Sequence, residues 1–172
     1  MKRHVVLLGL PGAGKSTVGR LAADALGARF ADVDRIVADR AGSSIAAIFA
    51  AQGESRFRDL ERAEMRRLLD GPPAVLAPGG GWAAWGDNLA QARNRALFIY
   101  LRTQPAVAAG RTAGGEARPL LTAPDPVQSV EDLLAARERY YASADATVET
   151  GDRTPEDLAL EVTRLARARA GW

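Results

Sequence analysis

Short apolar runs alternate along the whole chain with longer segments in which apolar residues recur every three or four positions. Short runs of this kind, bounded by polar or turn-forming residues, are typical of strands that are buried on both faces of a sheet. They predict strands at residues 5–8, 29–31, 74–77, 97–101 and 146–148.

The segments between these runs have the apolar spacing of amphipathic helices. They predict helices at residues 16–26, 34–41, 44–51, 55–69, 85–95, 104–109, 130–141 and 155–169. The alternation of strand and helix predicts a three-layer α/β/α fold, in which helices cover both faces of a parallel sheet. Ligands bind such sheets at the carboxyl ends of the strands, so the residues that follow each strand are the candidates for function.

The first predicted strand leads directly into residues 9–16, GLPGAGKS, which fit the phosphate-loop pattern of glycine, four free positions and Gly-Lys-Ser. The glycines let backbone amides converge on phosphate oxygens, and the helix that follows aims its positive end at them. We expect Lys15 to reach the outer phosphates of a nucleoside triphosphate and Ser16 to ligate Mg²⁺. Lys2 and Lys15 are the only lysines, which fits a phosphate-binding role for Lys15.

The length of 172 residues fits one domain that spans residues 1–172. The absence of cysteine excludes disulfides and thiol catalysis. The apolar run after residues 1–4 is too short for a signal peptide or a membrane span, so we expect a cytoplasmic protein with no membrane partner. The net charge of +2 and the dispersed basic residues argue against nucleic-acid binding.

Asp32 and Asp34 follow the second predicted strand. In one interpretation Asp34 only caps the next helix, and Asp32 faces solvent. In the other, which the neighbouring phosphate loop favours, the two carboxylates divide two tasks, supporting Mg²⁺ and orienting the hydroxyl of a phosphoryl acceptor.

Three glycines, residues 79–81, follow the third predicted strand after Pro78. They form either a flexible turn or a surface on which a ligand lies directly against backbone amides, since no side chain intervenes. Residues 53–61 have the composition of a solvated helix, although Glu61 stands three positions after Arg58 and would orient its guanidinium. Arg137 fits a surface ion pair and a ligand contact equally well.

Residues 110–125 combine glycines, prolines and charges with little apolar periodicity. This composition is typical of a mobile lid that closes over a substrate. Arg118 lies within this segment, where an arginine can swing onto a transferring phosphate.

Taken in order, these motifs resemble the shikimate kinase family, a branch of P-loop kinases related to the nucleoside monophosphate kinases. The resemblance covers nearly the whole chain, and its ordered set of motifs is more specific than the phosphate loop alone. The matching elements are residues 9–16, Asp32-Val33-Asp34 with Ile36, residues 42–45 with Ile48-Phe49, Gly53-Glu54 with Phe57-Arg58 and Glu61, residues 79–81, residues 118–121, and Arg137 with Tyr141 and Ala144-Asp145.

The resemblance implies the nucleoside monophosphate kinase fold, with five parallel strands in the order 2-3-1-4-5. It also implies transfer of the γ-phosphate of ATP to the 3-hydroxyl of shikimate, a step of chorismate and aromatic amino acid biosynthesis. ATP, Mg²⁺ and shikimate are the expected ligands, and a monomer is the expected state.

The same resemblance implies a role for each matching residue. The expected catalytic residues are Asp34, which contacts the substrate hydroxyls and accepts the proton, Lys15 and Arg118. The expected substrate site consists of Asp34, Arg58, Glu61, Gly79, Gly80, Gly81 and Arg137, with the arginines on the carboxylate. The expected ATP site consists of Gly12, Ala13, Gly14, Lys15, Ser16, Thr17, Arg111, Arg118, Arg153 and Pro155, and Mg²⁺ is assigned to Ser16 and Asp32.

The chain departs from the family pattern at two positions, since Pro78 stands where Thr is common and Arg139 where Pro is usual. The second departure leaves open whether Arg137 or Arg139 contacts the substrate, and the spacing to Tyr141 favours Arg137. Two alternatives remain open, a P-loop kinase of another small acceptor such as gluconate or a nucleoside monophosphate, and a catalytically silent ATP-binding module. The arginine pair argues against a neutral acceptor, and the intact Lys15 argues against a silent module.

Overall fold

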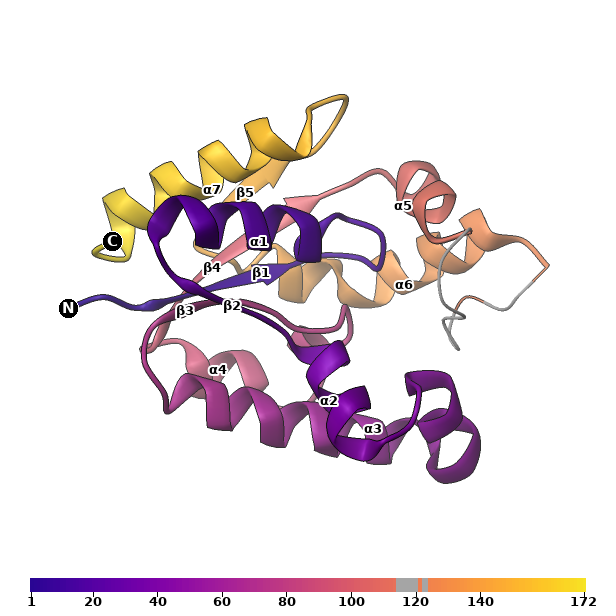
Figure 1. Cartoon of the computed structure of the whole chain (residues 1–172). Helices are drawn as coiled ribbons and strands as arrows, with labels where there is room; N and C mark the ends of the chain where they lie inside the picture. The colour runs from indigo at the N-terminus through magenta and orange to yellow at the C-terminus, as the bar shows by residue number, and fades with distance from the viewer. Residues whose placement is uncertain (114–120, 122–123) are drawn as a thin grey trace.

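The computed structural model describes residues 1–113, 121 and 124–172, and within these ranges five strands form one parallel sheet at the centre of the molecule (Figure 1). The strands are β1 (His4–Leu8), β2 (Arg29–Asp32), β3 (Ala74–Ala77), β4 (Ala96–Arg102) and β5 (Ala146–Glu149). Their order across the sheet is β2-β3-β1-β4-β5, and every neighbouring pair is parallel. The predicted fold class and strand order are therefore confirmed.

Helices cover both faces of this sheet (Figure 1). One face packs against α1 (Lys15–Leu26) and α7 (Pro155–Arg169), whose buried residues form one apolar cluster with the strands. The cluster on the opposite face takes its residues from α2 (Val33–Ala41), α3 (Ile45–Leu69), the 3₁₀ helix η1 (Trp82–Ala84), α4 (Asn88–Ala92), α5 (Pro105–Thr112) and α6 (Pro126–Tyr141).

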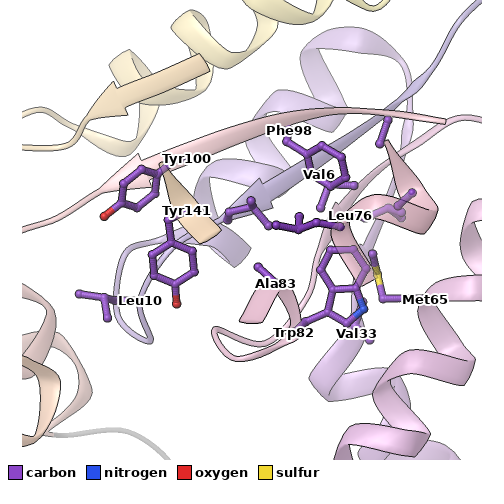
Figure 2. Close-up of a cluster of buried hydrophobic side chains, with 14 of the residues drawn as sticks. Val6, Leu10, Val33, Met65, Leu76, Trp82, Ala83, Phe98, Tyr100 and Tyr141 are labelled. Atoms are coloured by element: carbon purple, nitrogen blue, oxygen red, sulfur yellow. The ribbon is translucent and has the colours of Figure 1, made fainter. Parts of the chain in front are cut away.

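The central strand shows why the short runs are apolar throughout. Successive side chains of a strand point to opposite faces, so Val5 and Leu7 join the cluster of α1 and α7, whereas Val6 joins the other cluster. A strand that is covered on both faces is therefore mostly apolar, and in β1 the only polar residue is His4 at its start. Figure 2 shows part of the second cluster, in which Val6 and Phe98 from the sheet lie near the indole of Trp82.

Two glycines with positive φ interrupt helical structure between β2 and β4. The separate helices predicted at residues 44–51 and 55–69 are confirmed as the two parts of α3, which meet at a kink at Gly53, where φ is 80°. The helix predicted at residues 85–95 is present but shorter, as α4, because Gly86, with φ of 57°, precedes it in a non-helical conformation.

The segment predicted as a lid, residues 110–125, is bounded differently in the structure. Its first three residues belong to α5, which ends at Thr112. The helix predicted at residues 130–141 begins earlier, at Pro126, because the Asp125 side chain caps it by accepting a hydrogen bond from Gln128 N at 3.1 Å. Residues 114–120 and 122–123, and with them Arg118, lie outside the described residues.

None of the helices in the described ranges combines the length and the apolar character needed to cross a bilayer. His4, the only histidine, lies at the start of β1 with 3% of its surface exposed. Its Nδ1 accepts a hydrogen bond from the backbone N–H of Ala74 at 3.2 Å, which ties β1 to the start of β3. Burial lowers the pKa of His4 below its ordinary value of 6.5, against the opposing effect of the Leu69 and Gly71 backbone.

We expect acid to destabilise the fold through His4. Because the pKa is lower in the folded state than in the unfolded state, the stability that neutral His4 contributes is complete above pH 6.5 and is lost as the pH falls through the folded-state value. Between about pH 8 and about pH 5, the free energy of unfolding should therefore fall further for the wild type than for His4→Asn, which keeps an acceptor for Ala74. Urea denaturation at both pH values measures this difference, and an NMR titration of the imidazole that gives a pKa at or above 6.5 would contradict it.

Candidate active site

The phosphate loop connects β1 to α1 and places the start of α1 at the carboxyl edge of the sheet. Gly14 is the residue that precedes the helix, and α1 begins at Lys15. The Lys15 ammonium donates hydrogen bonds to the carbonyls of Gly9 and Leu10, at 2.8 and 2.9 Å. Lys15 Nζ therefore lies against the loop itself, at the end of the helix that carries positive partial charge.

Asp32, at the end of β2, contacts the start of α1 next to the phosphate loop. Its carboxylate accepts a hydrogen bond from Ser16 Oγ at 2.5 Å and another from Arg35 N at 3.3 Å, which caps α2. The interpretation in which Asp34 caps this helix is therefore wrong, because the cap is Asp32. Asp32 ends β2 and Asp34 lies within the helix, since α2 begins between them at Val33.

Asp34 lies in the first turn of α2 and faces the glycines that follow β3. A Cβ atom built on Gly79 would stand 2.8 Å from Asp34 Oδ1 and 2.5 Å from Glu61 Oε1. The N–H of Gly79 donates to Glu61 Oε1 at 2.8 Å. Two carboxylates from different helices thus meet at the same glycine.

Glu61 and Arg58 form a buried ion pair on α3. Arg58 Nη1 donates to Glu61 Oε2 at 2.8 Å, and the two residues have 4% and 0% of their surface exposed. Burial raises the pKa of Glu61 to about 7, although the Arg58 guanidinium acts against this and the Asp34 charge adds to it. The solvated helix that composition favours for residues 53–61 is wrong on this face, because the charged side chains point inward.

The absence of side chains on the glycine turn lets the Arg58 guanidinium lie against it. A Cβ on Gly81 would stand less than 3.0 Å from three guanidinium atoms of Arg58, a distance that real Cβ contacts do not reach. Glu54 contacts the outer side of the same guanidinium at 3.3 Å. The turn and the two glutamates therefore fix the position of Arg58.

Arg137 reaches the same turn from α6. It has 7% of its surface exposed, so the interpretation as a surface ion pair is wrong. A Cβ on Gly80 would stand 3.1 Å from Arg137 Nη1 and 3.2 Å from the carbonyl oxygen of Gly9. Gly80 consequently lies between the buried Arg137 guanidinium and the phosphate loop, and contacts both.

Tyr141 holds Gly80 in place and was not among the predicted site residues. Its hydroxyl donates to the Gly80 carbonyl at 2.5 Å, and its ring is completely buried against Tyr100. Burial raises the pKa of this phenol, and Arg137 acts in the opposite direction. The spacing of four residues between Arg137 and Tyr141, which places both on one face of a helix, was the available signal.

Arg139 lies elsewhere. Its guanidinium is exposed, stacks over the ring of Tyr140 at 4.7 Å from the centroid, and donates to the Tyr140 hydroxyl at 2.7 Å. Of the two arginines that the sequence left as alternatives, Arg137 is the one that contacts the glycine turn.

A cleft of about 710 Å³ opens along the phosphate loop. Its walls include Lys15, Ser16, Asp32 and Asp34, and also Arg111, whose Nη1 donates to Gly12 O at 3.4 Å. Other predicted ATP-site residues in its lining are Gly12, Gly14 and Thr17, and residues that the prediction missed are Arg35, Ala38, Asp39 and Ile45. Arg58 and Arg137 do not line the cleft, but the glycine turn that they contact continues directly from Pro78 in its wall.

Two predicted ATP-site residues lie away from this cleft. Arg153 pairs with Glu161 at 2.5 Å and donates to the Asp157 carbonyl at 3.2 Å, between β5 and α7. Pro155 is the first residue of α7. Their expected position beside the adenine stays a prediction.

The oxygen atoms of Ser16 and Asp32 suit a hard cation such as Mg²⁺. Among the described residues, no group of three or more His, Cys, Asp or Glu side chains is arranged to hold a metal ion. A site with so few protein ligands is the kind in which Mg²⁺ keeps several waters and binds through phosphate oxygens.

Comparison with known proteins agrees with this geometry. The family model described as shikimate kinase matches residues 11–167. The chain is 44% identical over 170 residues to a protein named shikimate kinase from Caulobacter vibrioides, covering 98% of this chain and 84% of the relative. It is 39% identical over 165 residues to the shikimate kinase of Geobacter sulfurreducens, covering 96% and 91% of the two chains.

Solved structures give the same result. A shikimate kinase from Acinetobacter baumannii, in complex with shikimate, superposes with a TM-score of 0.93 at 34% identity, over 98% of this chain and 94% of that one. A gluconokinase from Sinorhizobium meliloti superposes with a TM-score of 0.68 at 18% identity, over 99% and 94% of the chains. The second likeness concerns the fold alone.

Removing one partner of the Arg58 and Glu61 pair should be strongly destabilising. Glu61→Leu leaves a buried guanidinium without its nearest carboxylate, so we expect a loss of about 3–5 kcal/mol in the free energy of unfolding. Glu54→Ala, which removes the half-exposed partner, should cost about 1 kcal/mol or less. Urea denaturation compares these variants with the double variant Arg58→Met/Glu61→Leu, which should recover part of the loss, and equal costs for the two single variants would refute the buried pair.

Proposed function

The chain belongs to the shikimate kinase family, and we propose that it transfers the γ-phosphate of ATP to the 3-hydroxyl of shikimate, giving shikimate 3-phosphate and ADP. This is a step in the biosynthesis of chorismate and the aromatic amino acids. The observation that carries the proposal is the position of Gly80, next to the phosphate loop on one side and to the Arg137 guanidinium on the other.

The arginines suit the carboxylate of shikimate. A guanidinium presents a rigid, planar set of donors that matches a carboxylate, and such a pair is strongest where water is excluded. Arg58 and Arg137 are both buried, come from different helices and contact the same turn. A carboxylate held between them would lie on the backbone of the glycine turn, Gly79 to Gly81, close to Asp34.

Asp34 suits the acceptor hydroxyl. It lines the cleft that contains the phosphate loop and also approaches Gly79 at the edge of the glycine turn. A hydroxyl that donates a hydrogen bond to this carboxylate would be oriented toward the γ-phosphate, and Asp34 would accept its proton during transfer. Glu61 supports this site indirectly, because it holds the Arg58 guanidinium and the Gly79 amide.

Lys15 and the helix behind it suit the phosphates of ATP. Phosphoryl transfer passes through a loose transition state, so most of the rate enhancement comes from alignment and from positive charge around the transferring group. Lys15 Nζ donates to carbonyls of the phosphate loop, beside which the outer phosphates of ATP would lie. Arg111 approaches the same loop from α5, and Arg118 is proposed to join it from outside the described residues.

Mg²⁺ bound with ATP would be held by Ser16 and, directly or through a water, by Asp32. The two side chains already share a hydrogen bond of 2.5 Å, so both oxygens face the same point beside the phosphate loop. The ion would supply positive charge to the β- and γ-phosphate oxygens.

The arginines suit the alternative acceptor gluconate equally, because gluconate is also a carboxylate. The contrast between the two solved structures favours shikimate, since the likeness to the gluconokinase extends only to the fold. A silent ATP-binding module is disfavoured because Asp34 and the two buried arginines have no use in binding ATP alone.

The acceptor is tested by measuring ADP release with shikimate, quinate, gluconate and AMP. Because a site built to bind specific hydroxyls rejects analogues that leave its polar groups unpaired, kcat/KM for shikimate should exceed the others by about 100-fold or more. A different acceptor with a higher kcat/KM would refute the assignment.

The role of Arg137 is tested against Arg139, two positions away on the same helix. Arg137→Ala should raise the Kd for shikimate about 30-fold or more, as expected when a buried charged partner of a carboxylate is removed. Arg139→Ala, which removes an exposed guanidinium, should leave this Kd within about twofold. Isothermal titration calorimetry measures both, and a larger effect at Arg139 would reverse the assignment.

A further inference from the structure

A second cavity, of about 320 Å³, lies between α3, η1 and α4. It shares no lining residue with the cleft at the phosphate loop. One wall is the face of α3 that carries Arg62, Met65, Arg66 and Leu69, at the spacing of successive helical turns. The rest of the lining includes Trp82 from η1, residues Asn88, Gln91 and Ala92 from α4, and Arg95, which directly precedes β4.

Two of the residues that line this cavity carry a buried hydrogen-bond donor with no acceptor among the described residues. Trp82 has 1% of its surface exposed, and its Nε1 is buried without a partner. Figure 2 shows that the indole nitrogen lies on the side of Met65, another lining residue. Arg62 Nε is buried and equally without a partner, although the end of the same guanidinium pairs with Asp87.

Buried polar groups without partners are rare in folded proteins, and each calls for an explanation. Both of these groups are donors that cannot act as acceptors. The missing partner is therefore an acceptor, and both donors belong to residues that line the same cavity from different elements.

The charges around the cavity favour an anion. Arg62, Arg66 and Arg95 supply three guanidinium groups to the lining, whereas Asp70 is its only carboxylate among the described residues. Arg66 Nη2 is engaged by the neutral Gln91 at 2.7 Å, and Arg95 pairs with Asp70. Met65, Leu69, Ala92 and the indole give the rest of the wall an apolar character.

We propose that this cavity is a binding site for a small organic anion, with its carboxylate or phosphate group on Trp82 Nε1 and Arg62 Nε and its apolar body against Met65 and Leu69. One ordered water occupies only about 30 Å³ and would leave most of the cavity and all of its apolar wall unused. The site is separate from the proposed kinase reaction, so either proposal can fail without the other.

The test uses benzoate as the anionic probe and benzamide as its neutral analogue, with the indole N–H signals of ¹⁵N-labelled protein as the readout. The chain has three tryptophans, so Trp85→Phe and Trp172→Phe assign the Trp82 signal by elimination without changing the cavity. Benzoate should shift the Trp82 signal in a saturable manner, and benzamide should not. The Trp172 signal should stay in place, because its Nε1 already donates to the Arg3 carbonyl at 2.9 Å.

Arg62→Lys is the variant that isolates the proposed contact, because it keeps the positive charge but removes the Nε donor. It should raise the Kd for benzoate about tenfold or more, the expected effect of one hydrogen bond to a charged group. Arg56→Lys, an exposed position on the same helix outside the cavity, is the matched control and should leave the Kd unchanged.

Three results would overturn the proposal. The first is a Trp82 signal that does not move up to the solubility limit of benzoate, which would mean that water alone occupies the cavity. The second is an equal shift with benzamide. The third is a shift that persists unchanged in Arg62→Lys, which would mean that benzoate binds at the buried pair of Arg58 and Arg137 instead.

Discussion

Backbone packing at the glycine turn decides where the other groups of the candidate site can stand. Gly81 leaves the space that the Arg58 guanidinium fills, and Gly80 leaves the space between Arg137 and the phosphate loop. A single added methyl group at either position would force a guanidinium or the loop to move. The turn thereby brings α3, α6 and the loop after β1 to one point, although these segments are far apart in the sequence.

Burying the charges of Arg58 and Glu61 lowers the stability of the fold, and apolar packing compensates for this loss. Taking Arg58 and Glu61 out of water carries a desolvation penalty that their attraction offsets only in part, and the raised pKa of Glu61 expresses the same penalty. In exchange, the Arg58 guanidinium is held in position before a ligand binds, so binding costs little side-chain entropy. The apolar clusters on both faces of the sheet supply the stability that makes this possible.

The sequence predicted the sheet well and the interior charges poorly, for a physical reason. A strand buried on both faces leaves a local signal, a run such as Val5 to Leu8, and the phosphate loop is fixed by the spacing of its own residues. Burial of Arg58 and Arg137 depends on segments that approach from elsewhere in the chain, so composition favoured a solvated position for Arg58 and left Arg137 open. Likewise, which aspartate caps α2 depends on a shift of two residues in the start of the helix. The break at Gly86 depends on a backbone angle that the pattern of Trp85 and Leu89 does not reveal.

Helix α3 contributes residues both to the candidate active site and to the second cavity, from neighbouring faces. Arg58 and Glu61 are three positions apart and turn toward the glycines, whereas Arg62, Met65 and Leu69 lie on a neighbouring face that lines the second cavity. The segment that follows β3 also contributes to both sites, because Gly81 contacts Arg58 and the next residue, Trp82, lines the second cavity. Trp82 N also donates to the Gly79 carbonyl at 3.1 Å, so the residue that lines the cavity is hydrogen-bonded to the turn that contacts both buried arginines.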